Sequence, residues 1–306
     1  MDRIFVLVLL IFNFALLAGQ KMPEADNGTV KIKLDLTRGG AICYVSLSGS
    51  DENLVNIADE GRYIQQSYYA GRMLDRKAEG QSPRWSPWPW NPIQVGDAFR
   101  NRAEILDFKK NGDTLYVKCI PMLWDMDNKP AEAEMEQWSV LKGNVIEVRN
   151  KLTCFRTDTI YGEGIMRDQE LPAVYPISKL KGLFYYKGGK PFSNDTLSNP
   201  EVVNLSSGFW GIYPDVTEHW MAFVDDDNFG MGVYNPECVY FLAGMSGGPG
   251  GDAGSSSTSY IAPVKKAALK KNSVYGYTYY IIIGTLDEIR SRVYEINTKN
   301  NGSSEE

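Results

Sequence analysis

Histidine is almost absent from this sequence, and that absence excludes several kinds of site. The 306 residues include a single histidine, His219, which rules out multi-histidine zinc or copper sites and hydrolases that place two histidines on one helix. No phosphate-binding loop, dinucleotide fingerprint or nucleophile elbow occurs either. The cysteines are few and too widely spaced for a metal knuckle: Cys43, Cys119, Cys154 and Cys238. We therefore expect no metal ligands and no cofactor.

Positive charge is also scarce. The formal net charge is -6 and the pI is near 5.1, whereas binding to nucleic-acid phosphates needs a basic face. A nucleic-acid partner is therefore not expected. The composition is otherwise that of a globular protein, with 43% hydrophobic and 23% charged residues.

Long apolar runs are missing beyond residue 19. The one such run, residues 4–19, is short for a membrane span and typical of a signal-peptide core, and a polar stretch at 20–28 follows it. We predict a signal peptide at residues 1–19, with a signal anchor as the alternative. The mature protein is then secreted or periplasmic, with no membrane segment after cleavage. Export permits disulfides, but the four cysteines lie in apolar, strand-like stretches and fit equally well as small buried side chains.

Aromatic residues and a two-residue hydrophobic period are what the sequence has in abundance. Apolar and polar residues alternate in several segments that are bounded by Gly, Asn or Asp turn signals. The clearest are residues 29–36, 114–120, 144–152 and 277–283. This pattern predicts an all-β fold, a large antiparallel β-sandwich, formed by one domain over residues 20–300 with a polar tail at 301–306.

A short C-terminal helix is the one exception to the β pattern. Thr285 is placed to cap it, and Glu288, three residues later, completes a capping box. Leu286, Ile289, Val293 and Ile296 form a single apolar stripe at helical spacing. We expect this helix to pack over one end of the sheets.

Two long segments interrupt the strands. Residues 75–98 contain four prolines and the tryptophans Trp85, Trp88 and Trp90, so this loop is expected to fold back onto the sandwich. Residues 245–258 are almost entirely glycine and serine, which fits a mobile flap and an inert excursion equally well.

A polar strand near residue 63 is the strongest candidate for ligand binding. In extended backbone, Gln65 and Tyr69 share one face with Ser67, and Gln66 lies on the other face. Together with Arg62, these side chains suit sugar hydroxyls, although a solvated strand face is the alternative. The tryptophans of the loop would stack on sugar rings, unless they form a hydrophobic lid.

Carboxylates at a predicted strand end supply candidate acid–base chemistry. Asp168 and Glu170 point to one face in extended backbone, roughly 7 Å apart at ~3.3 Å per residue, a spacing suited to an acid and a base with water between them. Arg167 would keep one of them ionised. A solvated turn with surface ion pairs is the alternative. Asp75 and Asp97, at the margins of the Trp-rich loop, are alternative partners.

His219 follows Glu218 at the start of a predicted strand, where a carboxylate could orient the imidazole for proton transfer. A structural role is the more common one for a lone histidine. The acidic run 225–228 could ligate calcium, but a type I turn between the strands at 220–225 and 229–235 explains it more simply.

Several motifs resemble the galactose-mutarotase-like supersandwich family of exported carbohydrate-active proteins. They are residues 38–42 (RGGAI), 53–56 (NLVN), 61–69 (GRYIQQSYY), 169–172 (QELP), 220–223 (WMAF), 230–236 (GMGVYNP) and 284–287 (GTLD). The resemblance spans nearly the whole mature chain and implies a β-supersandwich fold. Mutarotases of this fold use a histidine and a carboxylate, whereas polysaccharide hydrolases and lyases also occur in the family. The resemblance therefore also implies activity on a polysaccharide or oligosaccharide.

The leading hypothesis is a glycoside hydrolase with paired carboxylates, Glu170 with Asp168 or Asp75. The binding residues would be Arg62, Gln65, Gln66, Tyr69 and the Trp-rich loop. The second hypothesis is a lyase acting on a uronic-acid polymer. There Arg62, Arg72 or Arg167 neutralises the uronate, and Tyr175 or His219 moves protons. The third is a glycan-binding module without catalysis.

Overall fold

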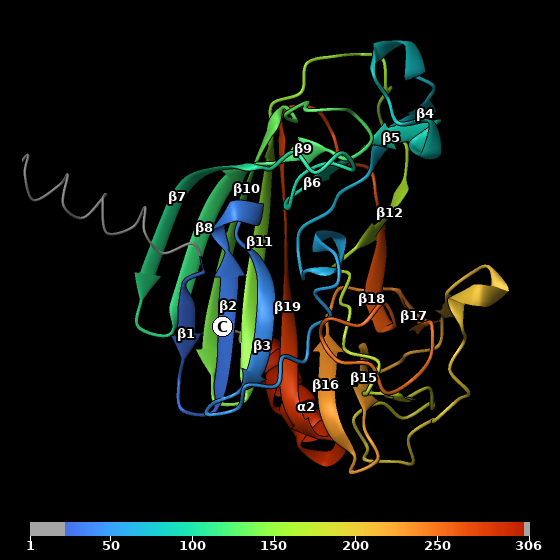
Figure 1. The fold of residues 1–306 in the computed structure, drawn as a ribbon. Coiled ribbons are helices and arrows are strands. Elements are labelled where there is room, and N and C mark those ends of the chain that lie inside the picture. The colour runs from blue at the N-terminus through green and yellow to red at the C-terminus, as the bar shows by residue number, and fades with distance from the viewer. Residues whose placement is uncertain (1–21, 303–306) are drawn as a thin grey trace, which may run out of the picture.

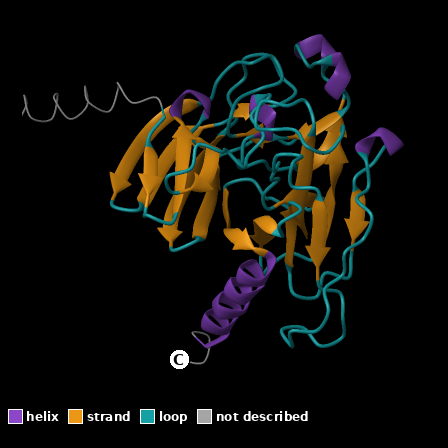
Figure 2. Cartoon of the chain, turned by 60° about the horizontal axis from the view of Figure 1, so that its bottom comes forward, coloured by secondary structure: helices purple, strands orange, loops and turns teal. Residues whose placement is uncertain are grey.

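The computed structural model describes residues 22–302 and shows an all-β protein with one long C-terminal helix (Figures 1 and 2). Strands account for 47% of the described residues and helices for 11%, so the predicted fold class is confirmed. The predicted signal peptide at 1–19 lies outside the described residues. Within the part that is described, no helix is long and apolar enough to cross a membrane.

The largest sheet has eight strands, all paired antiparallel, in the order β13-β15-β16-β19-β11-β10-β8-β7. In chain order its strands are β7 (Glu104–Asn111), β8 (Thr114–Ile120), β10 (Ala133–Lys142), β11 (Val145–Cys154), β13 (Gly182–Tyr185), β15 (Trp220–Val224), β16 (Phe229–Tyr234) and β19 (Ser273–Thr285). The alternating segments at 114–120, 144–152 and 277–283 are therefore strands, as predicted.

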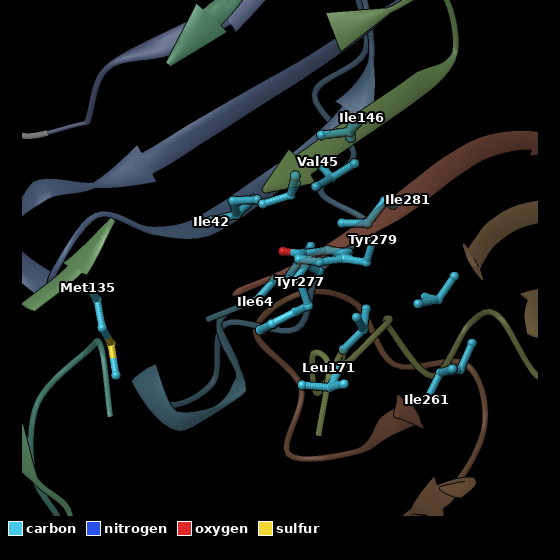
Figure 3. Close-up of a cluster of buried hydrophobic side chains, with 14 of the residues drawn as sticks. Ile42, Val45, Ile64, Met135, Ile146, Leu171, Ile261, Tyr277, Tyr279 and Ile281 are labelled. Carbon is cyan, nitrogen blue, oxygen red and sulfur yellow. The ribbon is translucent and has the colours of Figure 1, made fainter. Parts of the chain in front are cut away.

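A three-stranded sheet, β1 (Glu24–Asp26), β2 (Val30–Asp35) and β3 (Ala41–Leu47), packs against the eight-stranded sheet. The core between them follows from the two-residue period, because every second side chain of a strand faces the same layer. Figure 3 shows Tyr279 and Ile281 of β19 among Ile42 and Val45 of β3 and Ile146 of β11. All five are less than 1% exposed.

A four-stranded sheet extends the same core and carries one wall of the cavity described below. Its order is β12-β18-β17-β14, formed by β12 (Arg167–Glu170), β14 (Gly211–Tyr213), β17 (Tyr240–Ser246) and β18 (Thr258–Ala267). Two ribbons complete the strands: β4 (Ala70–Leu74) with β5 (Trp88–Trp90), and β6 (Pro92–Ile93) with β9 (Met122–Leu123). Five 3-10 turns connect them: η1 (Leu36–Arg38), η2 (Glu60–Arg62), η3 (Lys77–Glu79), η4 (Pro83–Trp85) and η5 (Leu205–Ser207).

Helix α2 (Leu286–Gly302) covers the other face of the eight-stranded sheet. Ile289 and Val293 are fully buried against β15, β16 and β19, as the apolar stripe predicts. Gly232 of β16 permits this contact, because a Cβ there would lie 2.4 Å from the Ile289 side chain. The helix runs two residues into the predicted polar tail.

The cysteines and the two interrupting loops take defined places. All four cysteines are buried free thiols. The glycine-serine stretch forms the loop from the end of β17 to β18 and is tied to its neighbours. Ile57 N donates to Ala253 O at 2.7 Å, and Gly251 N donates to Ser178 Oγ at 2.9 Å. The acidic run is the β15–β16 turn, in which Asp225 Oδ1 accepts from the amides of Asp227 and Phe229.

The capping box of α2 supplies a test of the sequence interpretation. Thr285 N donates to Glu288 Oε2 at 2.8 Å, and Glu288 N donates back to Thr285 Oγ1 at 3.4 Å. We expect Thr285→Ala to lower the free energy of unfolding by about 1 kcal/mol, the usual cost of losing an N-cap. Urea denaturation measures this. The exposed Ser291→Ala, in the same helix, is the control and is expected to leave stability unchanged or slightly raised.

Candidate functional site

A cavity of about 440 Å³ lies between the four-stranded sheet, the chain segment 59–69 and the Trp-rich loop. The first wall comes from Glu170 of β12, Tyr175 and Trp210. A second part of the lining comes from Trp85 and Trp88 of the loop, together with Trp124, whose rings contact one another. This arrangement brings together many of the residues predicted from sequence: Arg62, Gln65, Tyr69, Trp85, Trp88, Glu170 and Tyr175.

The segment at 63–69 alternates between core and cavity, as its sequence pattern predicts. Ile64, Gln66 and Tyr68 are fully buried on the core side. Gln65, Ser67 and Tyr69 line the cavity. The segment is extended, and isolated bridges hold it, including Gln65 to Ala173 and Ser67 to Ile93.

The Gln65 amide is already used by the backbone around it. Its Oε1 accepts from Val95 N at 3.1 Å, and its Nε2 donates to Gly61 O at 3.2 Å. Gln65 thus lines the cavity but fixes the η2 turn with its polar atoms. Any ligand contact it makes comes in addition to these bonds.

Aromatic rings cover two sides of the cavity. On the loop side, the Trp85 ring centroid is 5.0 Å from that of Trp88 and 5.8 Å from that of Trp124. On the sheet side, Trp210 stacks on Tyr260 at 4.3 Å with an interplanar angle of 18°. Such rings present flat apolar faces with polar edges, which suits a ligand that has one apolar face and many hydroxyls.

Glu170 is the carboxyl group at the centre of this aromatic enclosure. It ends β12, and its Oε1 accepts a hydrogen bond from Tyr260 OH at 2.9 Å. Burial raises the pKa of Glu170, and the Tyr260 hydrogen bond offsets only part of that rise. The site therefore favours the protonated acid more than water does.

Three phenols surround this carboxyl. Burial, followed by the nearby charge of Glu170, raises the pKa values of Tyr69, Tyr175 and Tyr260 well above the usual range. The Tyr175 and Tyr260 rings lie 5.0 Å apart. At neutral pH these hydroxyls keep their protons, so they act as hydrogen-bond donors.

Arg62 and Asp59 form the charged part of the lining. Arg62 Nε lies 3.1 Å from Asp59 Oδ2, and Nη1 donates to Asn56 Oδ1 at 2.9 Å. Nη1 also reaches Ser255 O, at 3.3 Å, in the glycine-serine loop. The guanidinium is thus held in one orientation at the cavity wall.

Other predicted binding residues lie elsewhere. Gln66 and Trp90 are core residues: Gln66 bonds Glu136 O and Tyr68, and the Trp90 ring packs under Arg156. Arg72 donates to Ile160 O, and Arg167 donates to Gly71 O. Both arginines therefore fix backbone outside the cavity lining.

The predicted carboxylate partners of Glu170 are also outside the lining. Asp168 shares the face of β12 with Glu170, as predicted, but it is exposed and contacts Tyr240. Burial, together with this contact, raises the pKa of Tyr240 to about 12. Asp75 is exposed and bound by Lys77 and Ser86. Asp97 caps the backbone at Phe99 and Asn101. The carboxylate that does line the cavity with Glu170 is Asp59.

The expected orientation of His219 by Glu218 is wrong. His219 Nδ1 contacts Cys238 O at 3.0 Å, away from the cavity lining. Glu218 is fully buried and is held instead by Trp220, Tyr294 and Arg290. Both residues belong to the turn before β15, and His219 has a positive φ of 58°, so the side chains do not follow the geometry of a strand.

The sequence alone did not indicate the lining residues Asp59, Arg84, Trp124 and Trp210, nor the buried Tyr260 that bonds Glu170. Asp59 and Arg84 lie within segments that were singled out, so proximity to Arg62 and Trp85 could have indicated them. Trp124, Trp210 and Tyr260 come from distant positions that only the topology unites. Across residues 22–302, no group of three or more His, Cys, Asp or Glu side chains is arranged to hold a metal ion.

Comparisons with known proteins concern the fold. No family model matches the sequence, and no curated protein matches it. A putative aldose 1-epimerase from Escherichia coli K12 is 10% identical, with a TM-score of 0.47 over 87% of this chain and 99% of that chain. A galactose mutarotase related enzyme from Lactobacillus acidophilus is 14% identical, with a TM-score of 0.48 over 87% and 99%. Galactose-mutarotase-like proteins are thus among the structural neighbours, as the sequence motifs predicted.

A third solved structure is a quadruple mutant of the α-N-acetylgalactosaminidase from Bifidobacterium bifidum. It is 11% identical, with a TM-score of 0.50, and the match covers 91% of this chain and 39% of that one. At this identity the similarity is one of fold.

The raised pKa of Glu170 predicts a stability effect with a defined pH dependence. Below the pKa of an unfolded glutamate, about 4.3, the residue is protonated in both the folded and the unfolded state. Its burial then does not lower the free energy of unfolding through ionisation. Above that pKa, the unfolded chain ionises more readily than the folded protein, so stability is lost as pH rises through the folded pKa. We therefore expect Glu170→Gln to be more stable than the wild type near pH 7, with a difference that vanishes near pH 3.

Denaturant unfolding at several pH values measures that difference. Glu104→Gln is the control, because Glu104 is exposed and lies outside the cavity. A Glu170→Gln protein that is less stable than the wild type near pH 7 would contradict the assignment of Glu170 as a desolvated acid.

Proposed function

We propose that this protein is a carbohydrate-active enzyme that binds a saccharide in the aromatic cavity and uses Glu170 as a general acid. The observation that carries the proposal is a single carboxyl group with a raised pKa, enclosed by tryptophan and tyrosine rings. A desolvated carboxylic acid beside a stacking surface is the arrangement that protonates a glycosidic oxygen.

Each wall has a role in this proposal. Trp88 and Trp210 stack on the apolar faces of sugar rings, since both line the cavity. The Tyr260 hydroxyl fixes the Glu170 carboxyl through its 2.9 Å hydrogen bond. The phenols of Tyr69 and Tyr175 donate hydrogen bonds to oxygens of the ligand.

Glycoside hydrolysis also needs a second carboxylate, either as base or as nucleophile. Asp59 is the candidate for this role, because it lines the cavity and its Oδ2 lies 3.1 Å from Arg62 Nε. Glu170 of the predicted pair therefore remains the acid, and Asp59 takes the role that the sequence assigned to Asp168 or Asp75. The structural neighbours include an epimerase, a glucanotransferase and a galactosaminidase, which act on sugars by their titles, and this supports the general class.

A lyase is the second candidate, and the ring of phenols around Glu170 favours it. Elimination needs one group to remove a proton at C5 and another to protonate the departing O4. The protonated Tyr175, which lines the cavity, would serve as the acid, with ionised Glu170 as the base. The substrate would then be a uronic-acid polymer.

Digestion of a polysaccharide panel, read by product mass, tests these proposals. A hydrolase adds water to its products, a lyase forms an unsaturated product without water, and a binding module forms no product. We expect Glu170→Gln to lower kcat on the active substrate by about 10²- to 10⁴-fold, the usual contribution of general acid catalysis. Trp210→Ala is expected to raise KM.

Glu104→Gln is the matched control and is expected to keep full activity. Full turnover by Glu170→Gln would remove Glu170 from the mechanism. The absence of any product, with binding retained on a glycan array, would leave the non-catalytic module as the function.

We also propose, from the apolar run at residues 4–19 alone, that the protein acts outside the cytoplasm after removal of residues 1–19. The mature chain then begins at Gln20. Mass spectrometry of the N-terminal peptide from cell fractions checks this, and a chain that keeps residues 1–19 would contradict it.

A further inference from the structure

We propose that the saccharide recognised by this cavity is anionic, bearing a carboxylate or a sulfate group that Arg62 and Arg84 bind at the cavity wall. The inference rests on the proposed function and specifies its substrate class. It follows from the partners of the two guanidinium groups and from the charge of the lining.

Arg62 is held by the protein through only part of its guanidinium. Nε faces Asp59, and Nη1 is bound by Asn56 and by Ser255 O. Within residues 22–302, Nη2 has no hydrogen-bond partner, and it is not among the buried unpartnered atoms. A donor of this kind, fixed in position and facing a cavity, is suited to an oxyanion of the ligand.

Arg84 also lines the cavity and has a similarly open position. It belongs to η4, is exposed, and its guanidinium carbon lies 5.3 Å from the Trp85 ring centroid. No carboxylate of the described chain lies within 4.0 Å of it, although ion pairs occupy many other basic side chains of the protein. Stacking on Trp85 orients the guanidinium without neutralising it.

The lining of the cavity holds two guanidinium groups although the chain as a whole is acidic, with a net charge of -6. The charged residues of the lining are Asp59, Arg62, Arg84 and Glu170. Asp59 faces Arg62, whereas no carboxylate of residues 22–302 lies within 4.0 Å of Arg84. Positive charge without a carboxylate partner at the cavity favours an anionic ligand.

Matched pairs of oligosaccharides test the inference. One arm compares oligogalacturonate with its carboxyl-reduced form, and a second compares sulfated chondroitin oligosaccharides with their desulfated form. We expect the anionic member of at least one pair to bind about tenfold or more tightly, the effect of one charge-assisted hydrogen bond. Arg84→Gln is expected to remove that preference by weakening the anionic member to the level of the neutral one. Arg62→Gln is expected to weaken both members, because Arg62 also holds Asp59 and the glycine-serine loop.

Arg102→Gln is the matched control, because Arg102 is exposed and lies outside the cavity lining. Arg84→Gln is the decisive variant, since Arg84 holds no other segment in place, whereas Arg62 also anchors the glycine-serine loop. Equal binding of neutral and anionic members, or a preference that survives Arg84→Gln, overturns the inference while leaving the proposed enzyme class intact. A charge preference without any product would instead support the inference for a binding module and remove the proposed catalysis.

Discussion

The alternation of side chains along residues 64–69 connects the core of this protein to its cavity. Ile64, Gln66 and Tyr68 are buried in the core, and this burial fixes the register of the segment. Since neighbouring side chains of an extended chain point to opposite sides, Gln65, Ser67 and Tyr69 must then face the cavity. A shift by one residue would bury the cavity side and expose the core side. The stability of the sandwich therefore also fixes one wall of the site.

The position of a carboxyl group along β12 decides its chemistry. Asp168 and Glu170 share a face of the strand, yet only Glu170 lies beneath the rings of Tyr69, Tyr175 and Tyr260. Asp168, two residues earlier in the strand, is exposed to solvent. Burial penalises the ionised form of Glu170 and raises its pKa. The distance between the two carboxyl groups does not show which of them is a desolvated acid. The aromatic rings around Glu170 make that difference.

The strands and the helix could be predicted because their signals are local. The two-residue period marked β8, β11 and β19, and Thr285 with Glu288 marked the start of α2. Lining residues of the cavity could be predicted where one segment of the sequence carries a recognisable pattern, as with Gln65 and Tyr69. Trp124, Trp210 and Tyr260 are brought in by pairings between distant segments, and no local pattern records those pairings. Trp90 was misplaced for a related reason: composition identified an aromatic loop, but the pairing of β5 with β4 decides which ring turns inward.

Two separate features act on the carboxyl groups of the cavity. Burial among aromatic rings disfavours a negative charge on Glu170, whereas Asp59 forms an ion pair with the Arg62 guanidinium. The two carboxyl groups therefore lie in different surroundings, one desolvated and one ion-paired. Arg62 donates to Asn56 and to Ser255 O, so the glycine-serine loop helps to place this ion pair through a backbone carbonyl. A loop with almost no apolar residues can still take part in the electrostatics of the site, because every residue has a backbone carbonyl dipole.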